Sequence, residues 1–343
     1  MKLENHNFLS IHDVFADITW DKTHPGPVYN DSEDRLTVNY PITYHKHLLQ
    51  KKIAQIFKTD KEIHLDTVIS KHKPQGILQP LKKIKNIIAI SASKGGVGKS
   101  TIASNLACAL AQTGCKIGLL DGDLYGPNLP QLIGTQVKAN IENEKYQPVM
   151  AHQIATMSMG FLIDEKTPLV WRGPMASAYF QNMVFKTNWP ELDYLIIDLP
   201  PGTGDILLTM TQKIPISGVI LVSTPQCLSI KDCKKGIAML KKMEVPILGF
   251  IENMAGFKCA NCQHTTHIFP ENAVTKAMES DSIYKLGEIP LDSQLANEEG
   301  SQPLIIQNPH AKICKKIQQI AIKACAQLAC RPIAKRNLFK SST

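Results

Sequence analysis

Long apolar segments are missing from this sequence of 343 residues. No uninterrupted run reaches the roughly 18 to 20 apolar residues that a membrane-spanning helix needs. The opening stretch, MKLENHNFLSIHDVF, is polar and contains Glu4 and Asp13, so it lacks the apolar centre of a secretory signal peptide. We therefore expect a cytoplasmic location and no stable membrane association.

Regular cysteine pairing is missing as well. The nine cysteines are an odd number, and only Cys259 and Cys262 form a close pair. A secreted, disulfide-stapled domain has an even number at regular spacing, so the pattern indicates a reducing compartment, where thiols are core residues or metal ligands. The remaining cysteines fit the role of small buried residues; they are Cys108, Cys115, Cys227, Cys233, Cys314, Cys325 and Cys330.

A concentrated basic region is also missing, although the formal net charge is +8. Lysine and arginine are spread along the chain, with small clusters near residues 71–85 and 331–340. Clusters of this size are typical of solvated linkers and tails. With 43% hydrophobic and 20% charged residues, the composition is that of a folded globular protein, and we expect no nucleic-acid partner.

The first part of the chain is polar and rich in histidine. Residues 1–70 contain one strand pattern, DRLTVNYPI, and one amphipathic helix pattern, YHKHLLQKKIAQIFK, which together predict a small α/β module. Residues 71–85 contain prolines, a glycine and several lysines, the composition of a linker. The histidines of this part lack a consistent ligand spacing, and we expect them on the solvated surface; they are His45, His47, His64 and His72.

The chain changes character at residue 86. Short aliphatic runs such as NIIAIS, YLIIDL and GVILVS alternate with helical patterns over residues 100–113 and 230–243, without an internal repeat. Strands buried on both faces that alternate with helices predict a doubly wound, mostly parallel α/β sheet, whose ligands bind at the carboxyl ends of the strands. We assign this domain to residues 86–332 and a basic tail to residues 333–343.

A glycine-rich loop follows the first strand of this domain and precedes a helix. Its glycines allow backbone N–H groups to close on phosphate oxygens, Lys99 supplies a positive charge, and the Ser100 hydroxyl is suited to magnesium. The helix directs its positive end at the same anion. This pattern predicts a P-loop nucleotide site formed by Ser93, Lys94, Gly95, Gly96, Val97, Gly98, Lys99, Ser100 and Thr101.

Three aspartates come directly after strands. Asp121 and Asp123 follow the second strand and Asp198 follows a later one, so all three lie at the edge where phosphates bind. Asp198 can hold a water of Mg²⁺, and Asp123 can orient or deprotonate the attacking water. Asp121 either supports them or caps a turn. Gly202 and Gly204 allow the segment after Asp198 to change course when the terminal phosphate leaves.

The spacing of Cys259 and Cys262 lets both thiolates reach one metal or cluster. Zinc and a [4Fe-4S] cluster usually take four ligands. Either His264 and His267 complete a zinc site within one chain, or two chains contribute one thiol pair each. A redox pair and two ordinary thiols are the other readings, and spacing alone leaves all four open.

Five motifs in order give a more specific result: KGGVGKST, DGDLYGPN, VWRGPMAS, DYLIIDLPPGTGD and GFIENMAGFKCANC. Together they resemble the Mrp/ApbC family of iron–sulfur cluster carrier ATPases over about residues 86–330. The resemblance implies a homodimer that binds ATP and Mg²⁺, with Lys94 reaching the partner's phosphates and Asn253 at the adenine edge. It also implies a [4Fe-4S] cluster bridged by Cys259 and Cys262 of both subunits and passed to apo iron–sulfur proteins, with cluster-assembly scaffolds as further partners.

The resemblance has weaker points. Ser93 stands where family loops commonly have glycine, and residues 1–70 resemble only the second half of a MIP18 or DUF59 domain. By family analogy alone, Trp171–Met175 lie near the dimer face. Lys94 has the alternative reading of an ordinary exposed loop lysine, in which case it contributes nothing to hydrolysis.

Two other functions compete with the carrier. One is a positioning ATPase of the MinD and ParA type, which acts on membrane or DNA and needs no thiol pair. A membrane version needs a terminal amphipathic helix, whereas we expect the C-terminal apolar stripe to pack on the sheet; it consists of Ile313, Ile317, Ile320, Ala324 and Leu328. The other is a zinc-stabilised nucleotide switch without cluster chemistry.

Overall fold

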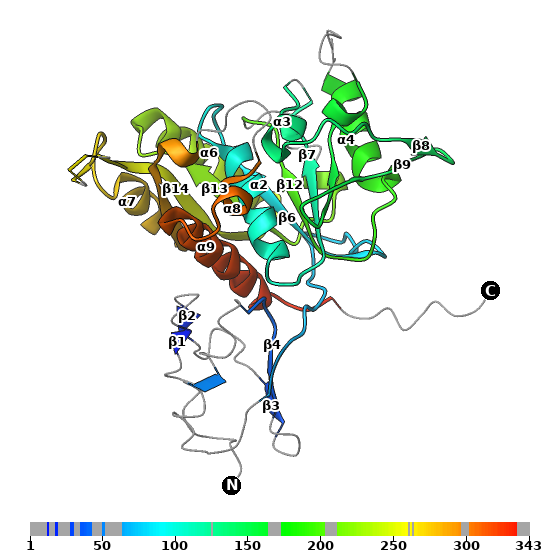
Figure 1. The fold of residues 1–343 in the computed structure, drawn as a ribbon, viewed down its shortest axis with the longest axis horizontal. Coiled ribbons are helices and arrows are strands. Elements are labelled where there is room, and N and C mark those ends of the chain that lie inside the picture. The colour runs from blue at the N-terminus through cyan, green and yellow to red at the C-terminus, as the bar shows by residue number, and fades with distance from the viewer. Residues whose placement is uncertain are drawn as a thin grey trace.

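The computed structural model contains a central sheet with helices on both faces (Figure 1). The structure describes residues 12–13, 18–19, 28–30, 35–42, 50–51, 64–124, 126–163, 173–202, 211–259, 261–262, 264–295 and 302–334. Within these residues the main sheet has nine strands. In spatial order they are β10 (Val149–Ala151), β11 (Ile154–Met157), β7 (Ile117–Asp121), β12 (Leu192–Asp198), β6 (Ile84–Ser91), β13 (Gly218–Ser223), β14 (Ile247–Lys258) and β15 (Thr265–Thr266), and β16 (Lys285–Leu291) pairs with β14.

The pairing confirms the predicted mostly parallel sheet. The central pairs from β11 to β16 are parallel, whereas β10 and β15 pair antiparallel with their neighbours. The inner strands are almost entirely buried, because helices cover both of their faces. This burial explains why their sequences are continuous apolar runs.

The helices divide between the two faces. On one face α2 (Lys99–Ala111) and α9 (Lys312–Ala329) pack with the short helices α3 (Leu129–Ile133) and α8 (Leu304–Gln307). On the other face lie α4 (Gly173–Lys186), α6 (Cys227–Lys242) and α7 (Ala273–Glu279). The apolar stripe expected to pack on the sheet belongs to α9 and is buried. Among the residues that the structure describes, no helix is long and apolar enough to span a bilayer.

The remaining elements are short. The strand predicted from DRLTVNYPI is present as β4 (Arg35–Val38), between β3 (Val28–Asn30) and β5 (His64–Thr67). The helix predicted next lies outside the described residues, apart from Gln50 and Lys51, which are helical. Elsewhere the structure has β1 (His12–Asp13), β2 (Ile18–Thr19), β8 (Ile141–Glu142), β9 (Lys145–Tyr146) and the 3₁₀ helices η2 (Met159–Phe161) and η3 (Ser293–Leu295).

The connecting segment before the main domain is held to that domain. His72 is buried, and the expectation of a solvated histidine there is wrong. Its backbone N–H donates to Asn86 Oδ1, its ring Nδ1 lies 3.0 Å from the Arg331 carbonyl oxygen, and burial lowers its pKa. His72 also forms an antiparallel bridge with Ile333, the first residue of the expected tail. The bridge between His72 and Ile333 forms because α9 brings the two segments together. Neither segment has a sequence pattern that predicts it.

Candidate functional site

The glycine-rich loop joins the carboxyl end of β6 to the start of α2. Gly96 and Gly98 have φ of 76° and 82°, the left-handed conformation that glycine adopts most easily. A Cβ at Gly98 would lie 2.4 Å from Asn253 Nδ2. That amide nitrogen donates to the Val97 carbonyl oxygen at 2.8 Å. Asn253, which the family resemblance predicts at the adenine edge, therefore contacts the phosphate loop directly through its side-chain amide.

Lys99 lies at the bottom of the loop and is buried, with 6% of its surface exposed. Its ammonium forms an ion pair with the Asp198 carboxylate at the end of β12. Burial raises the pKa of Asp198, and the charge of Lys99 opposes this increase. A buried charge requires such a partner, so the pair keeps a cation and an acidic group together at the carboxyl edge of the sheet.

A cavity of about 580 Å³ opens beside this pair. Lys94, Lys99, Ser100 and Asp123 line it, so the sheet brings together the predicted loop and one predicted carboxylate. The volume is within the usual range of small-ligand sites. Sequence reasoning did not assign the other side chains on its wall, although Asn128 is part of the DGDLYGPN motif; they are Asn128, Gln131, Leu132 and Pro201.

Asp121 has the role of an internal support. Its carboxylate accepts hydrogen bonds from the backbone N–H groups of Asp123 and Leu129 and from the Ser158 hydroxyl. Burial raises its pKa to about 7, and the charge of Asp198 adds to the effect. Ser158 follows β11, and no pattern in the sequence connects it to Asp121.

The segment after Asp198 begins next to the phosphate loop. The Gly202 N–H donates to the Ala92 carbonyl oxygen at 3.1 Å, and its φ is 104°. Gly204 and Trp171, which were also expected near the nucleotide or the dimer face, lie outside the described residues. Met175 is on α4 and is half exposed.

Lys94 lines the same cavity as Lys99 but differs from it in burial and in partners. Its side chain is exposed at the rim of the cavity. It makes no ion pair or hydrogen bond with any residue that the structure describes. The charge is therefore available to a group that approaches from outside the chain.

The two thiols lie on a hairpin at the end of β14. The Cys259 N–H donates to the His264 carbonyl oxygen at 2.9 Å, which closes the turn that carries Cys262. Cys259 is half-buried and Cys262 is exposed. The backbone N–H groups of Cys262 and Asn261 lower the pKa of Cys259, because they stabilise its thiolate.

The nearby His267 makes other contacts within the described residues. His267 Nδ1 lies 3.1 Å from the Ala255 carbonyl oxygen, and its Nε2 lies 3.5 Å from Glu271 Oε1. Within the described ranges, no group of three or more His, Cys, Asp and Glu side chains is placed to hold a metal ion. Two thiols are the ligands that this hairpin offers.

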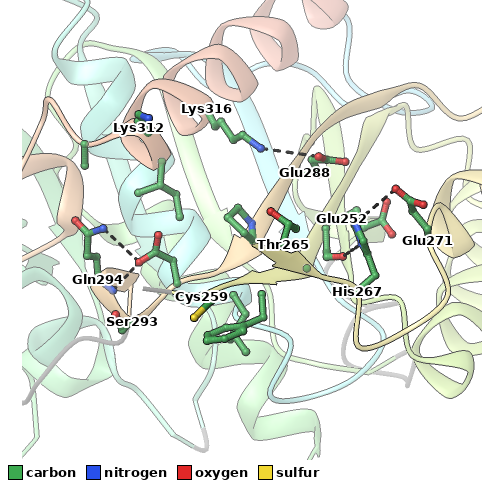
Figure 2. A pocket seen from close by; sticks show the side chains of 18 of the residues that line it. Glu252, Cys259, Thr265, His267, Glu271, Glu288, Ser293, Gln294, Lys312 and Lys316 are labelled. Carbon is green, nitrogen blue, oxygen red and sulfur yellow. Dashed lines mark hydrogen bonds and ion pairs between the residues drawn. The ribbon is translucent and has the colours of Figure 1, made fainter. Parts of the chain in front are cut away.

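A second, larger cavity of about 930 Å³ lies beside the thiol hairpin. Cys259 faces it from one side, and Lys312 and Lys316 at the start of α9 face it from the other (Figure 2). Glu288 lies on the wall and is 3.8 Å from the Lys316 ammonium. The cavity thus adjoins one thiol of the pair.

The sequence of this chain is similar to a known protein family and to characterised relatives. Residues 83–325 match the family described as "ParA: NUBPL iron-transfer P-loop NTPase". An iron–sulfur cluster carrier protein of Pseudomonas fragi is 42% identical over 265 residues, which cover 76% of this chain and 92% of the relative. The iron–sulfur cluster transfer protein NUBPL of Mus musculus is 39% identical over 259 residues, which cover 74% of this chain and 81% of that protein.

Solved structures show the same fold. A nucleotide-binding protein from Archaeoglobus fulgidus, described in complex with ADP and with Co, is 36% identical with a TM-score of 0.58; the match covers 67% of this chain and 91% of that one. The cell division ATPase MinD of Pyrococcus furiosus is 24% identical with a TM-score of 0.52, covering 69% of this chain and 97% of that one. The second likeness concerns the fold alone.

Proposed function

The chain belongs to the ParA family of NUBPL iron-transfer P-loop NTPases, and from this premise we propose that it is an ATP-hydrolysing carrier of an iron–sulfur cluster. The observation that carries the proposal is the presence, in one domain, of a phosphate loop whose exterior Lys94 makes no ion pair or hydrogen bond among the described residues, and of a hairpin that carries two thiols. In this proposal a second subunit completes both features.

ATP binding is assigned to the cavity at the phosphate loop. Its glycines admit the phosphates, Lys99 turns from Asp198 to the terminal phosphates, and Asn253 is assigned to the adenine edge by family resemblance. Ser100 and Asp198 are hard oxygen donors that line a recess of about 10 Å³, and they fit Mg²⁺, with Asp198 acting through water. The ion neutralises charge on the phosphate oxygens. Asp123 orients or deprotonates the attacking water.

The exposure of Lys94 at the cavity rim supports a position in trans. A lysine that reaches the phosphates of a second subunit adds positive charge where the transition state develops negative charge, as an arginine finger does. A homodimer is therefore part of the proposal. The hydrolysis rate depends on assembly, and a slow rate is expected for the isolated chain.

The cluster is the cargo. A [4Fe-4S] cluster takes four thiolates, and one pair from each of two subunits provides them. A cluster held at an exposed turn can pass to an apo iron–sulfur protein by ligand exchange, and scaffold proteins can supply it by the same route. We place this exchange in the cytoplasm.

Metal analysis after anaerobic reconstitution with iron and sulfide tests the proposal. The wild-type chain should retain iron and sulfide in equal amounts, and the double variant Cys259→Ser/Cys262→Ser should lose both. Cys227 is another exposed cysteine, so Cys227→Ser is the matched control and should retain the cluster. Equal iron in the double variant would refute the assignment.

The competing functions have less support. A zinc switch would require ligands beyond the thiol pair, whereas both ring nitrogens of His267 already contact other oxygens. A membrane-positioning ATPase would require a free amphipathic helix, whereas the apolar stripe of α9 is buried. The same metal analysis separates them, because zinc in place of iron would favour the switch.

A further inference from the structure

Strand β14 physically connects the phosphate loop to the thiol hairpin. Asn253, in the second half of this strand, donates to the Val97 carbonyl oxygen of the loop. Cys259 follows the last residue of the same strand. At about 3.3 Å per residue, the two positions are roughly 20 Å apart along one continuous piece of backbone.

This piece of backbone contains an irregularity between the two sites. In the pairing of β14 with β16, Asn253 lies opposite Ile289 and Phe257 opposite Leu291. Three residues on β14 therefore face one residue on β16, Pro290. Proline has no N–H to donate to the ladder, which gives the physical reason for the bulge.

The first residue of the bulge is in an unusual conformation. Met254 has φ of 55°, the left-handed region that a side chain other than glycine, asparagine or aspartate seldom occupies. Such residues persist only where the surrounding structure holds them, and they gather at switches and binding sites. Met254 comes directly after the residue that contacts the phosphate loop.

The far side of the bulge is held by the thiol hairpin. A Cβ at Gly256 would lie 3.3 Å from the His267 ring, and His267 Nδ1 contacts the Ala255 carbonyl oxygen. Phe257 pairs with Thr266 of β15. Ala255 and Gly256 of the bulge also line the 930 Å³ cavity that Cys259 adjoins, so this face of the strand has space to rearrange.

We propose that Asn253–Cys259 is a coupling element. In it, the bulge at Met254–Gly256 changes conformation with the phosphate loop and thereby alters the affinity of the thiol pair for the cluster. The inference rests on the proposed function and adds to it the route by which nucleotide and cluster influence each other. Such an influence is reciprocal, because each ligand changes the affinity for the other by the same factor.

The test measures the coupling factor in the full chain, which is the ratio of the nucleotide affinities with and without bound cluster. The affinity for a fluorescent, non-hydrolysable ATP analogue with Mg²⁺ is compared before and after anaerobic loading with iron and sulfide. We expect the wild-type affinities to differ by at least about fivefold, the lower end for coupled sites. Met254→Gly, which frees the hinge, and Asn253→Ala, which cuts its contact with the loop, should reduce the factor to below about twofold.

Two variants serve as controls. Met254→Asn should keep the wild-type factor, because asparagine tolerates the left-handed conformation. Glu244 also has a positive φ, of 56°, but lies after α6, and Glu244→Gly should leave the factor unchanged. A wild-type factor of one, or a wild-type factor retained in folded Met254→Gly and Asn253→Ala, overturns the coupling. A wild-type chain that binds no analogue or no cluster instead refutes the proposed function.

Discussion

The two lysines of the phosphate loop show how the surroundings of a residue determine its chemistry. Lys99 is buried against Asp198, whereas Lys94 is exposed and makes no ion pair or hydrogen bond among the described residues. A buried cation at a phosphate site contributes to binding as well as to hydrolysis. An exposed cation that acts in trans contributes mainly when the transition state forms.

We therefore predict different kinetics for the two alanine variants. Lys94→Ala should lower ATP turnover by at least about tenfold while nucleotide affinity changes by less than about threefold. Lys99→Ala should lower both. Steady-state ATP hydrolysis and equilibrium binding of an ATP analogue are the measurements. Normal turnover in Lys94→Ala would contradict a role in trans.

The buried carboxyl of Asp121 predicts a pH dependence of stability. Its pKa is about 7 in the folded protein and ordinarily 3.8, so between these values the folded chain holds a proton that the unfolded chain has lost. Stability therefore falls as pH rises from about 4 to about 7, by up to about 4 kcal/mol. Urea unfolding without nucleotide or Mg²⁺ should show this fall in the wild type and a smaller one in Asp121→Asn.

At the scale of elements, β6 and the residues that follow α9 hold the connecting segment. Asn86 of β6 accepts from the His72 N–H at 2.9 Å and donates to the Ser70 carbonyl oxygen at 2.8 Å. Gln75 donates to the Ile214 carbonyl oxygen ahead of β13. The segment that its composition predicts as a linker is thus anchored at several points.

Removing the Asn86 side chain should lower the free energy of unfolding. Asn86→Ala leaves the buried His72 N–H and the Ser70 carbonyl without their partner, so we expect a loss of about 2 to 3 kcal/mol in the free energy of unfolding. Asn188 also makes side-chain hydrogen bonds, but at an exposed position, and Asn188→Ala should change stability by less than about 0.5 kcal/mol. Equal effects in urea titrations would show that the segment is held elsewhere.

At the scale of the whole molecule, the assembly determines the metal content. A [4Fe-4S] cluster bridged by two subunits corresponds to about two iron atoms per chain. Light scattering of the anaerobically loaded protein should give a dimer with this ratio, and the Cys259→Ser/Cys262→Ser variant should carry no iron. About four iron atoms per chain in a monomer would contradict bridging.

The sequence by itself was sufficient for the parallel sheet, the phosphate loop and the family. Apolar runs such as YLIIDL indicate strands that are buried on both faces. The glycines before Lys99 indicate a loop whose backbone needs positive φ angles. Both features are visible in short contiguous stretches of sequence, so a local pattern is enough to predict them.

Contacts between distant segments were decided only by the tertiary structure. The buried His72, the support of Asp121 by Ser158 and the bond between Asn253 and Val97 each join residues that no periodicity relates. The pairs meet because β7 and β11 end side by side, because β14 passes the phosphate loop, and because α9 returns the chain to the start of the domain. The sequence contains these residues, but only packing places them within hydrogen-bonding distance.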